Sequence, residues 1–334
     1  MLRKVSDFLG KKILDIIKCI ALPLFVYCLF FVLSKGRYGN IGSMLAIARQ
    51  TVLYTLVGWA LMHNQIMGVW DFTPGAVVAL SGIIAGRLMY ATNTGVLGLV
   101  IFSVITATVL TLITFSVFHF MRIPSMICGL GILLIYEMLT SQLFGGAGVT
   151  VRGDLTILAK APYCYIILIV SGIVIYILFN YTQNGANTRT LGYGQKIAMN
   201  IGVDLTKTRI KNFIIEGVFL GLAAVISLSQ KGNASATVDM ASMSLGFDAI
   251  MGVFIGINLM SNCNLVIGIV IGTFTMKMLS AGLIAIGLNS NLQSIAQGIF
   301  LMIFIGLSSN KDRFLAYMND RKHKGEILRR INAE

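Results

Sequence analysis

Residues 188–203 read Thr-Arg-Thr-Leu-Gly-Tyr-Gly-Gln-Lys-Ile-Ala-Met-Asn-Ile-Gly-Val, a polar stretch that interrupts a series of long apolar runs. The stretch is capable of forming a helix, and it carries a small apolar cluster among its polar residues. We expect it to be a docking surface for another protein, because a merely solvated loop has no need of that cluster. The alternative is a solvated connecting loop.

The composition is that of a membrane protein. Of the 334 residues, 56% are hydrophobic and 12% are charged, and the mean hydropathy is +0.84. This much apolar surface cannot be buried in one aqueous core, so the bilayer is the expected solvent. The net charge of +13 comes from Lys and Arg residues that crowd the two termini and residues 183–211, which indicates membrane topology rather than nucleic-acid binding.

The apolar runs predict an all-α, polytopic fold, because a helix needs about 20 apolar residues to cross a bilayer. The predicted spans are 13–33, 50–69, 74–91, 95–119, 125–144, 163–181, 210–229, 246–260, 265–286 and 292–308. Together they form a plan of about ten transmembrane helices.

Two segments near the N-terminus have alternative interpretations. Run 13–33 follows basic residues as a signal peptide does, but it exceeds the usual apolar length of about 7 to 15 residues and has no cleavage site. We therefore expect a retained span. Segment 38–49 is either an amphipathic helix in the outer interface or a plain extension of the second span.

Run 246–260 is too short to cross the membrane straight. It also carries Asp248, Gly252, Gly256 and Asn258. We expect a broken or re-entrant helix there, with its free backbone groups shielded by protein or water.

The Lys and Arg residues lie mostly on one side of this plan. The inside segments collect Arg3, Lys4, Lys11, Lys12, Lys18, Arg122, Arg189, Lys196, Lys207, Arg209, Lys211 and the tail from Lys311 to Arg330, whereas the outside segments hold Lys35, Arg37, Arg87, Arg152, Lys160 and Lys231. The positive-inside rule then places both termini in the cytoplasm, namely residues 1–12 and the basic tail of residues 309–334. It places the long loop of residues 182–209 on the same side.

The long loop separates five predicted spans from five others. Because five is odd, any structural duplication of the halves would have to be inverted, an arrangement that places a substrate path at the repeat interface. Three glycine pairs with a spacing of four, Gly217 with Gly221, Gly252 with Gly256 and Gly268 with Gly272, permit close helix approach. Static packing is the first interpretation and a moving seam is the alternative.

No pattern predicts catalysis or a metal site. The chain has three histidines, no paired carboxylates at motif spacing, and no locally supported Ser/His/Asp arrangement, so we assign no catalytic residue and do not expect an enzyme. The five cysteines, Cys19, Cys28, Cys128, Cys164 and Cys263, lie in or beside apolar runs and are expected to be small hydrophobic side chains.

Three motifs carry a resemblance to a known family. Residues 68–75, Gly-Val-Trp-Asp-Phe-Thr-Pro-Gly, resemble the Gly-Gly-Ile-Asp-Leu-Ser-Val-Gly signature of ribose/galactoside-type (simple-sugar) ABC importer permeases. Residues 124–131, Pro-Ser-Met-Ile-Cys-Gly-Leu-Gly, resemble their Pro-Phe-Ile-x-Thr-Leu-Gly. Residues 194–203 resemble their cytoplasmic coupling segment. The three occur in the family's order and cover most of the chain.

The chain also departs from that family. Residues 255–263 read Ile-Gly-Ile-Asn-Leu-Met-Ser-Asn-Cys, where the family usually has a glycine-rich Gly-Gly-Thr-Ser-Leu-x-Gly-Gly turn. His63-Asn64-Gln65 replaces an apolar stretch, and the outer loop from Gly145 to Pro162 is abbreviated. These departures bear on the substrate and leave the transport plan unchanged.

The resemblance implies that residues 1–334 form one permease domain of an importer in the bacterial cytoplasmic membrane. Such an importer has two permease subunits, two ATPase subunits and an extracytoplasmic solute-binding protein. The second permease is either an identical copy or a divergent one. This chain has no Gly-x-x-x-x-Gly-Lys-Ser/Thr loop, so ATP and Mg²⁺ are expected on the partner ATPase and no cofactor is expected here.

In this scheme the polar stretch is the lever that an ATPase moves. The coupling residues are expected to be Gly194, Gln195, Lys196, Ala198, Met199, Gly202 and Val203. Ala198, Met199 and Gly202 are expected to face the ATPase, and Asn187 and Thr188 to face solvent.

Charged residues inside the predicted spans are further candidates, since a charge at mid-membrane costs about 2.5 to 3.5 kcal/mol. Glu137, Glu216 and Lys277 are expected to face protein or water. For Lys277 three interpretations remain: a structural partner of an acid, a pathway-lining residue, or a misplaced span boundary.

Polar residues are candidates for contact with a neutral polyhydroxylated solute, because a path needs only weak, distributed contacts. The pathway candidates are His63, Asn64, Gln65, Asp71, Thr73, Gln142, Asn258 and Asn289. Asp71 has a second interpretation, in which it accepts backbone N–H bonds at the start of the helix that Thr73 and Pro74 begin.

We therefore predict the permease subunit of an ABC importer that moves a sugar or sugar-like solute by alternating access. Nucleosides on the same plan are an alternative. Two other classes compete with it: a proton-coupled secondary transporter that uses Glu137, Glu216, His63 and Lys277 as a relay, and a membrane scaffold that transports nothing.

Overall fold

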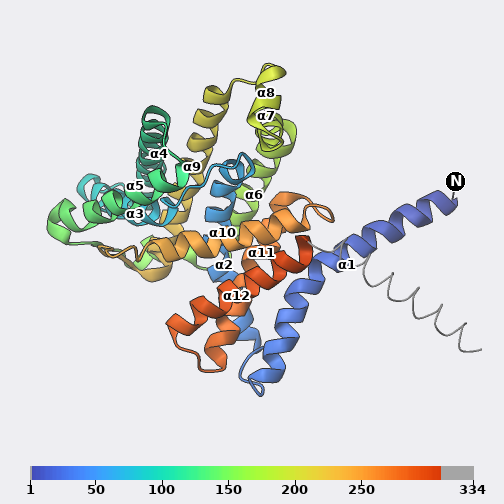
Figure 1. The fold of residues 1–334 in the computed structure, drawn as a ribbon. Helices are drawn as coiled ribbons and strands as arrows, with labels where there is room; N and C mark the ends of the chain where they lie inside the picture. The colour runs from blue at the N-terminus through green and yellow to red at the C-terminus, as the bar shows by residue number, and fades with distance from the viewer. Residues whose placement is uncertain (1, 310–334) are drawn as a thin grey trace, which may run out of the picture.

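The computed structural model describes residues 2–309, with the side chains of 17–289 and 292–306. Most of this part of the chain is helical (Figure 1). The long helices are α1 (Leu2–Leu33), α2 (Ile41–Ile66), α3 (Pro74–Thr92), α4 (Gly95–Met121), α5 (Ser125–Gln142), α6 (Tyr163–Tyr181), α9 (Leu205–Lys231), α10 (Met243–Leu259), α11 (Leu265–Ala285) and α12 (Ser290–Ser309). The short elements are the helices α7 (Gln183–Gly192) and α8 (Gln195–Asn200), the 3₁₀ helices η1 (Leu143–Gly146) and η2 (Gly153–Ala159), and the antiparallel strands β1 (Val149–Thr150) and β2 (Asn233–Ala234).

The ten long helices confirm the predicted polytopic all-α plan. Among the described residues, seven helices are long and apolar enough to cross a bilayer, and three shorter apolar stretches lie in α1, α10 and α12. Each coincides with one predicted run. Helix α9 is the most enclosed of the seven and α6 the least, so α9 lies at the centre and α6 offers most of its surface to lipid.

The structure decides the open question about segment 38–49 and changes two other expectations. Helix α2 runs unbroken from Ile41, so the segment is an extension of the second span. Residues 1–12 are largely the start of α1, whose N-terminal half projects from the bundle in Figure 1. Residues 182–209 contain the expected short helix, α8, and also α7 and the first residues of α9, which were not expected. The predicted tail lies almost entirely outside the described residues.

Of the two forms expected at 246–260, the broken helix is wrong, and the re-entrant helix stays a prediction. Helix α10 is continuous, and the irregular backbone precedes it, in residues 232–242. The glycines that suggested a break are contact points instead. A Cβ on Gly272 of α11 would lie 2.2 Å from the carbonyl oxygen of Gly252, so the two helix backbones touch there.

The same close packing joins α4 and α9. A Cβ on Gly217 would lie 2.4 Å from the Cα of Thr108, and the hydroxyl of Thr111 donates a 2.9 Å bond to the Phe213 carbonyl oxygen. The other glycines of the three predicted pairs, Gly221, Gly256 and Gly268, also abut neighbouring backbone. The pairs therefore allow close helix packing, as predicted, and a moving seam stays the alternative prediction.

Each half of the chain contains a helix followed by an irregular linker and a second helix. In the first half α2 leads through residues 67–73 into α3, and in the second α9 leads through residues 232–242 into α10. Helix α3 packs on the next helix, α4, and on α9, the helix before the linker of the other half. In the same way α10 packs on the next helix, α11, and on α2, the helix before the linker of the first half. The two linkers meet where α3 and α10 begin, since a Cβ on Gly75 would lie 1.8 Å from the Ser242 carbonyl oxygen. Discontinuous helices of this kind frame solute sites in membrane transporters.

Candidate functional site

A buried polar cluster lies where α2 and α9 meet the first linker. It consists of Asn64 on α2, Asp71 and Thr73 in the linker, and Glu216 on α9, none of them more than 2% exposed. His63, the neighbour of Asn64 on α2, is equally buried, and its ring meets that of Phe179 on α6 edge-on, with 5.6 Å between the ring centroids. The Asn64 amide donates a 2.5 Å hydrogen bond to Glu216 Oε2.

The cluster has hydrogen-bonding capacity that the described residues do not use. Buried atoms without a partner include both ring nitrogens of His63, Asn64 Oδ1, Asp71 Oδ2, Thr73 Oγ1 and Glu216 Oε1. Most buried polar atoms in folded proteins are hydrogen-bonded, so these atoms are available to bind water or another polar group.

Buried carboxyl groups also lie at the start of α3 and of α10. Asp71 Oδ1 accepts a 2.7 Å bond from the backbone N–H of Thr73, which precedes Pro74 at the first position of α3. Asp71 thus accepts a backbone N–H bond beside this helix start, as predicted, but the bond stops at Thr73, the N-cap residue, and no side chain caps α3 itself. Glu137 on α5 accepts 2.8 Å bonds from the backbone N–H groups of Met240 and Ser242 at the start of α10. Negative groups at helix N-termini complement the helix dipole.

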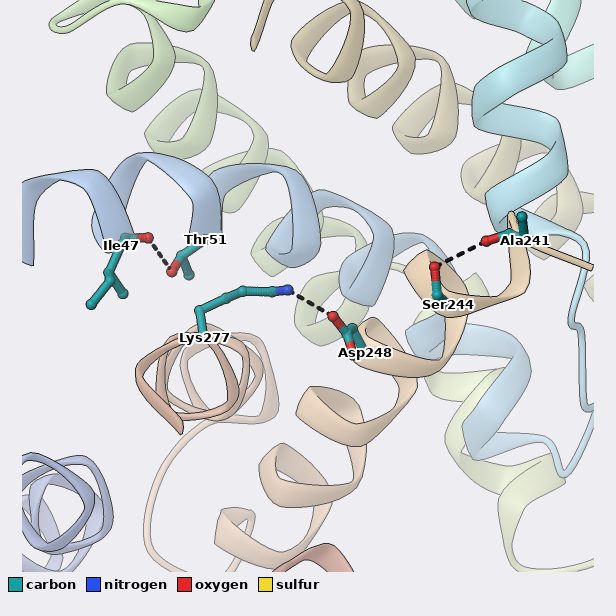
Figure 2. A network of polar contacts seen from close by, with 6 residues as sticks. All are labelled: Ile47, Thr51, Ala241, Ser244, Asp248 and Lys277. Carbon is teal, nitrogen blue, oxygen red and sulfur yellow. Dashed lines mark hydrogen bonds and ion pairs between the residues drawn. The ribbon is translucent and has the colours of Figure 1, made fainter. Parts of the chain in front are cut away.

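A hydroxyl-rich cavity of about 160 Å³ lies beside the second linker. Its walls come from α3, α9, β2 and the first turn of α10, and its hydroxyl groups from Ser227, Ser235, Thr237, Ser242 and Ser244. The sequence analysis missed these residues, because single Ser and Thr residues in a loop carry no pattern. Figure 2 places Ser244 on α10, where its hydroxyl donates a 3.0 Å bond to the Ala241 carbonyl oxygen.

The structure does not gather all the predicted pathway residues. Gln65 is half-buried next to the cluster, whereas Gln142 is exposed at the end of α5 and Asn289 is exposed before α12. Asn258 is half-buried on α10 and bonds the Phe254 carbonyl oxygen of its own helix at 3.0 Å. Their contact with solute stays a prediction.

Lys277 forms an ion pair that crosses from α11 to α10. Its Nζ lies 2.7 Å from Asp248 Oδ2 (Figure 2). The same Nζ lies 3.3 Å from the centre of the Tyr54 ring. The predicted internal pairing is confirmed, and Lys277 lies well inside α11, so a misplaced span boundary is ruled out. The acid is Asp248, not Glu137 or Glu216. Those two also face protein, as predicted, with at most 1% of each exposed.

The predicted coupling segment forms two short helices, α7 and α8, at one end of the bundle (Figure 1). Gly194 and Gly202 flank α8 with φ of +140° and +84°, values that favour glycine. Gln195, Lys196 and Met199 are exposed, and Val203 is half-buried.

The assignment of Ala198 to the docking face is wrong. Its side chain is fully buried in a small apolar cluster with Met67, Leu191 and Phe213. In a single helical turn, consecutive residues point in different directions, so Ala198 anchors α8 while its neighbours face outward. The exposed apolar side chains are Tyr193 at 81%, Ile197 at 56%, Met199 at 50% and Ile201 at 66%.

Thr188 is also not solvent-facing. It is buried and bonded to Asn212 of α9, whose Nδ2 donates to Thr188 Oγ1 at 3.0 Å and to Met67 Sδ at 3.2 Å. Asn184 of α7 donates to Asn212 Oδ1 at 2.7 Å. Asn212 lies one helical turn from Glu216, so α9 connects α7 directly to the buried cluster.

A model of the family described as branched-chain amino acid transport system / permease component matches residues 43–305. Over 333 residues the chain is 24% identical to the ribose import permease protein of Bacillus subtilis, with 93% of this chain and 94% of that protein covered. It is 22% identical to the D-allose transport system permease protein of Escherichia coli, with 84% and 88% covered. It is 20% identical to an autoinducer 2 import system permease protein of Yersinia pseudotuberculosis, with 86% and 90% covered. No solved structure matches the chain.

Proposed function

Because this chain belongs to the branched-chain amino acid transport system / permease component family, we propose that it is the transmembrane subunit of an ATP-driven importer for a sugar or sugar-like solute. An extracytoplasmic binding protein delivers the solute, and a separate ATPase supplies the energy. The observation that carries this proposal is the family match together with a relative of almost equal length that is named as a ribose import permease.

The location follows from the same evidence. The chain is a multi-pass membrane protein of the cell membrane. We propose that the membrane is a bacterial cytoplasmic membrane and that both termini and the α7–α8 segment lie in the cytoplasm. The distribution of Lys and Arg supports this orientation.

Alternating access requires the two halves of the chain to move relative to each other around a central site. The two linkers, 67–73 and 232–242, interrupt the helices that meet at that centre. We propose that force enters at α8, passes through α7 to Asn212 of α9, and reaches the first linker through Met67. The apolar side chains exposed on and beside α8 form the contact with the ATPase.

A proton-coupled transporter would need its ionisable groups to relay protons to one another. Lys277 is engaged by Asp248, and Glu137 is engaged by the start of α10. These contacts give Lys277 and Glu137 structural partners outside the proposed relay of Glu137, Glu216, His63 and Lys277.

The test is reconstitution. The chain is co-expressed with an ABC ATPase and a sugar-binding protein from the same organism, purified, and inserted into proteoliposomes. We expect the ATPase to copurify and the uptake of labelled D-ribose, D-allose or D-fructose to require ATP. Uptake that follows a proton gradient and ignores ATP would contradict the proposal.

The composition of the importer is a separate hypothesis. Residues 255–263 lack most of the glycines of the family's turn, which motivates the idea that this chain is one half of a heterodimer. Recovery of an active importer with two copies of this permease and no other would refute it.

A further inference from the structure

One face of α10 is left partly uncovered by the rest of the chain. Its exposed and half-buried residues recur at helical spacing and include Ser244, Phe247, Asp248, Met251, Phe254 and Asn258. The rings of Phe247 and Phe254 contact those of Phe72 and Trp70 in the first linker. The opposite face, which includes Gly252 and Gly256, packs on α11, while α2, α3 and α12 cover other parts of the helix. The uncovered face begins at the hydroxyl-rich cavity, since Ser244 belongs to both.

This face carries a charge. The Asp248 side chain is 23% exposed, whereas Lys277 behind it is 8% exposed. Lipid cannot cover this face without a substantial cost for a carboxylate at membrane depth. The face therefore meets water or another polar surface, and Figure 2 shows Lys277 reaching Asp248 from α11.

The ion pair leaves the carboxylate able to bind a second group. Lys277 contacts Oδ2, and no bond from a described residue reaches Oδ1. A carboxylate has several lone pairs and donates nothing, so it suits the hydroxyl groups of a neutral solute. Phe247, beside Asp248 and 38% exposed, adds an apolar ring surface for C–H groups.

We propose that this face of α10 lines the solute path and that Asp248 accepts hydrogen bonds from a polyhydroxylated ring. Lys277 is its positioning residue: it holds the carboxylate against α10 and balances its charge. This inference rests on the proposed transport function and names the residue that recognises the solute within the membrane.

Variants without these charges distinguish solute binding by Asp248 from a purely structural role of the ion pair, because only solute binding predicts a loss of uptake that persists when stability is recovered. Lys277→Met leaves Asp248 without its partner and is expected to lower the apparent melting temperature, by about 5 °C or more. The double variant Asp248→Asn, Lys277→Met removes both charges and is expected to recover that stability. If Asp248 binds solute, uptake by the double variant stays low, with KM raised about tenfold for loss of one charge-assisted hydrogen bond. Recovery of wild-type uptake together with stability would overturn the proposal.

A second experiment tests water access without disturbing the pair. In a background with Cys28→Ser and Cys263→Ser, Ser244→Cys is treated with a charged, membrane-impermeant methanethiosulfonate. Ile173→Cys on the lipid-facing helix α6, where Ile173 is 55% exposed, is the matched control. We expect rapid modification at 244 in the assembled importer and none at 173. No modification at 244 under conditions that label a surface cysteine would overturn the proposal.

These outcomes are separable from failure of the transport function itself. Copurification of the ATPase and ATP-dependent uptake by the unmodified chain test the function. The labelling experiment measures access to α10 whether or not any of the three sugars is carried.

Discussion

The side-chain amide of Asn64 on α2 donates a hydrogen bond to the carboxylate of Glu216 on α9, and so ties together the two helices that lead into the linkers. Both side chains are fully buried. Glu216 receives no other N–H bond from the described residues, so the pair holds α2 and α9 in one register at the centre of the subunit.

Removal of the Asn64 amide should therefore destabilise the subunit. Asn64→Leu leaves a buried carboxyl group without its donor, and we expect a loss of about 1–3 kcal/mol. The measurement is thermal unfolding of the purified protein followed by size-exclusion chromatography. Met62→Leu, a volume-conserving change at a buried apolar position of the same helix, should have much less effect. Equal stability of the Asn64→Leu and wild-type proteins would show that the bond is not needed.

The features that could be predicted from the sequence are those that depend on residues close together in the chain or on contact with the bilayer. The helix that begins at Pro74 and the role of Asp71 at its start were predictable, because the residues involved are neighbours in the chain. The apolar runs likewise identified all ten long helices. In both cases the determining interaction is either within a few residues or with the bilayer.

Contacts between residues that are far apart in the sequence could not be predicted from local patterns. Asp248 and Lys277 lie 29 positions apart on different helices, and no spacing rule identifies them as partners. The glycines of α10 suggested a helix break because glycine is a poor helix former, whereas their actual role is contact with α11. The direction of Ala198 depends on how one turn of helix packs on α9, which only the three-dimensional structure shows.

The glycine seam between α4 and α9 should tolerate no side chain. Gly217→Ala places a Cβ 2.4 Å from the Thr108 backbone, and the helices must separate, at a cost of about 1–3 kcal/mol or more. Gly131→Ala on α5 is the matched control, because its Cβ would meet nothing within 4 Å and alanine favours the helix. Thermal unfolding of the two variants should differ clearly. Equal melting temperatures of the Gly217→Ala and Gly131→Ala proteins would contradict the claim that close packing at Gly217 is needed for stability.

The correction at α8 changes which variants test the ATPase contact. Met199→Glu places a charge on the exposed apolar surface, so the permease should fold normally while the yield of copurified ATPase falls, by about tenfold or more. Ala198→Arg should instead lower the yield of permease, because its site is buried.

Two readouts separate these effects, namely permease yield and the ratio of ATPase to permease. Gln183→Glu on the exposed start of α7 is the control for added charge and should leave both unchanged. A normal ATPase ratio for Met199→Glu would move the contact away from α8.

Asn212 allows coupling to be separated from docking. Its side chain bonds Asn184 and Thr188 on α7 and Met67 in the first linker, and it contributes nothing to the exposed surface of α8. Asn212→Leu should therefore leave ATPase binding intact while disconnecting α7 from the linker. We expect ATP hydrolysis that no longer rises when the loaded binding protein is added, and uptake reduced about tenfold, as for loss of one or two buried hydrogen bonds.

The matched control is Asn187→Leu. Asn187 lies on α7, as Asn184 and Thr188 do, but it makes no bond to Asn212 among the described residues, so this variant should keep the rise in ATP hydrolysis. If Asn212→Leu hydrolyses ATP in proportion to loaded binding protein and transports normally, force reaches the linker by another route, and the path from α8 through α7 and α9 is wrong.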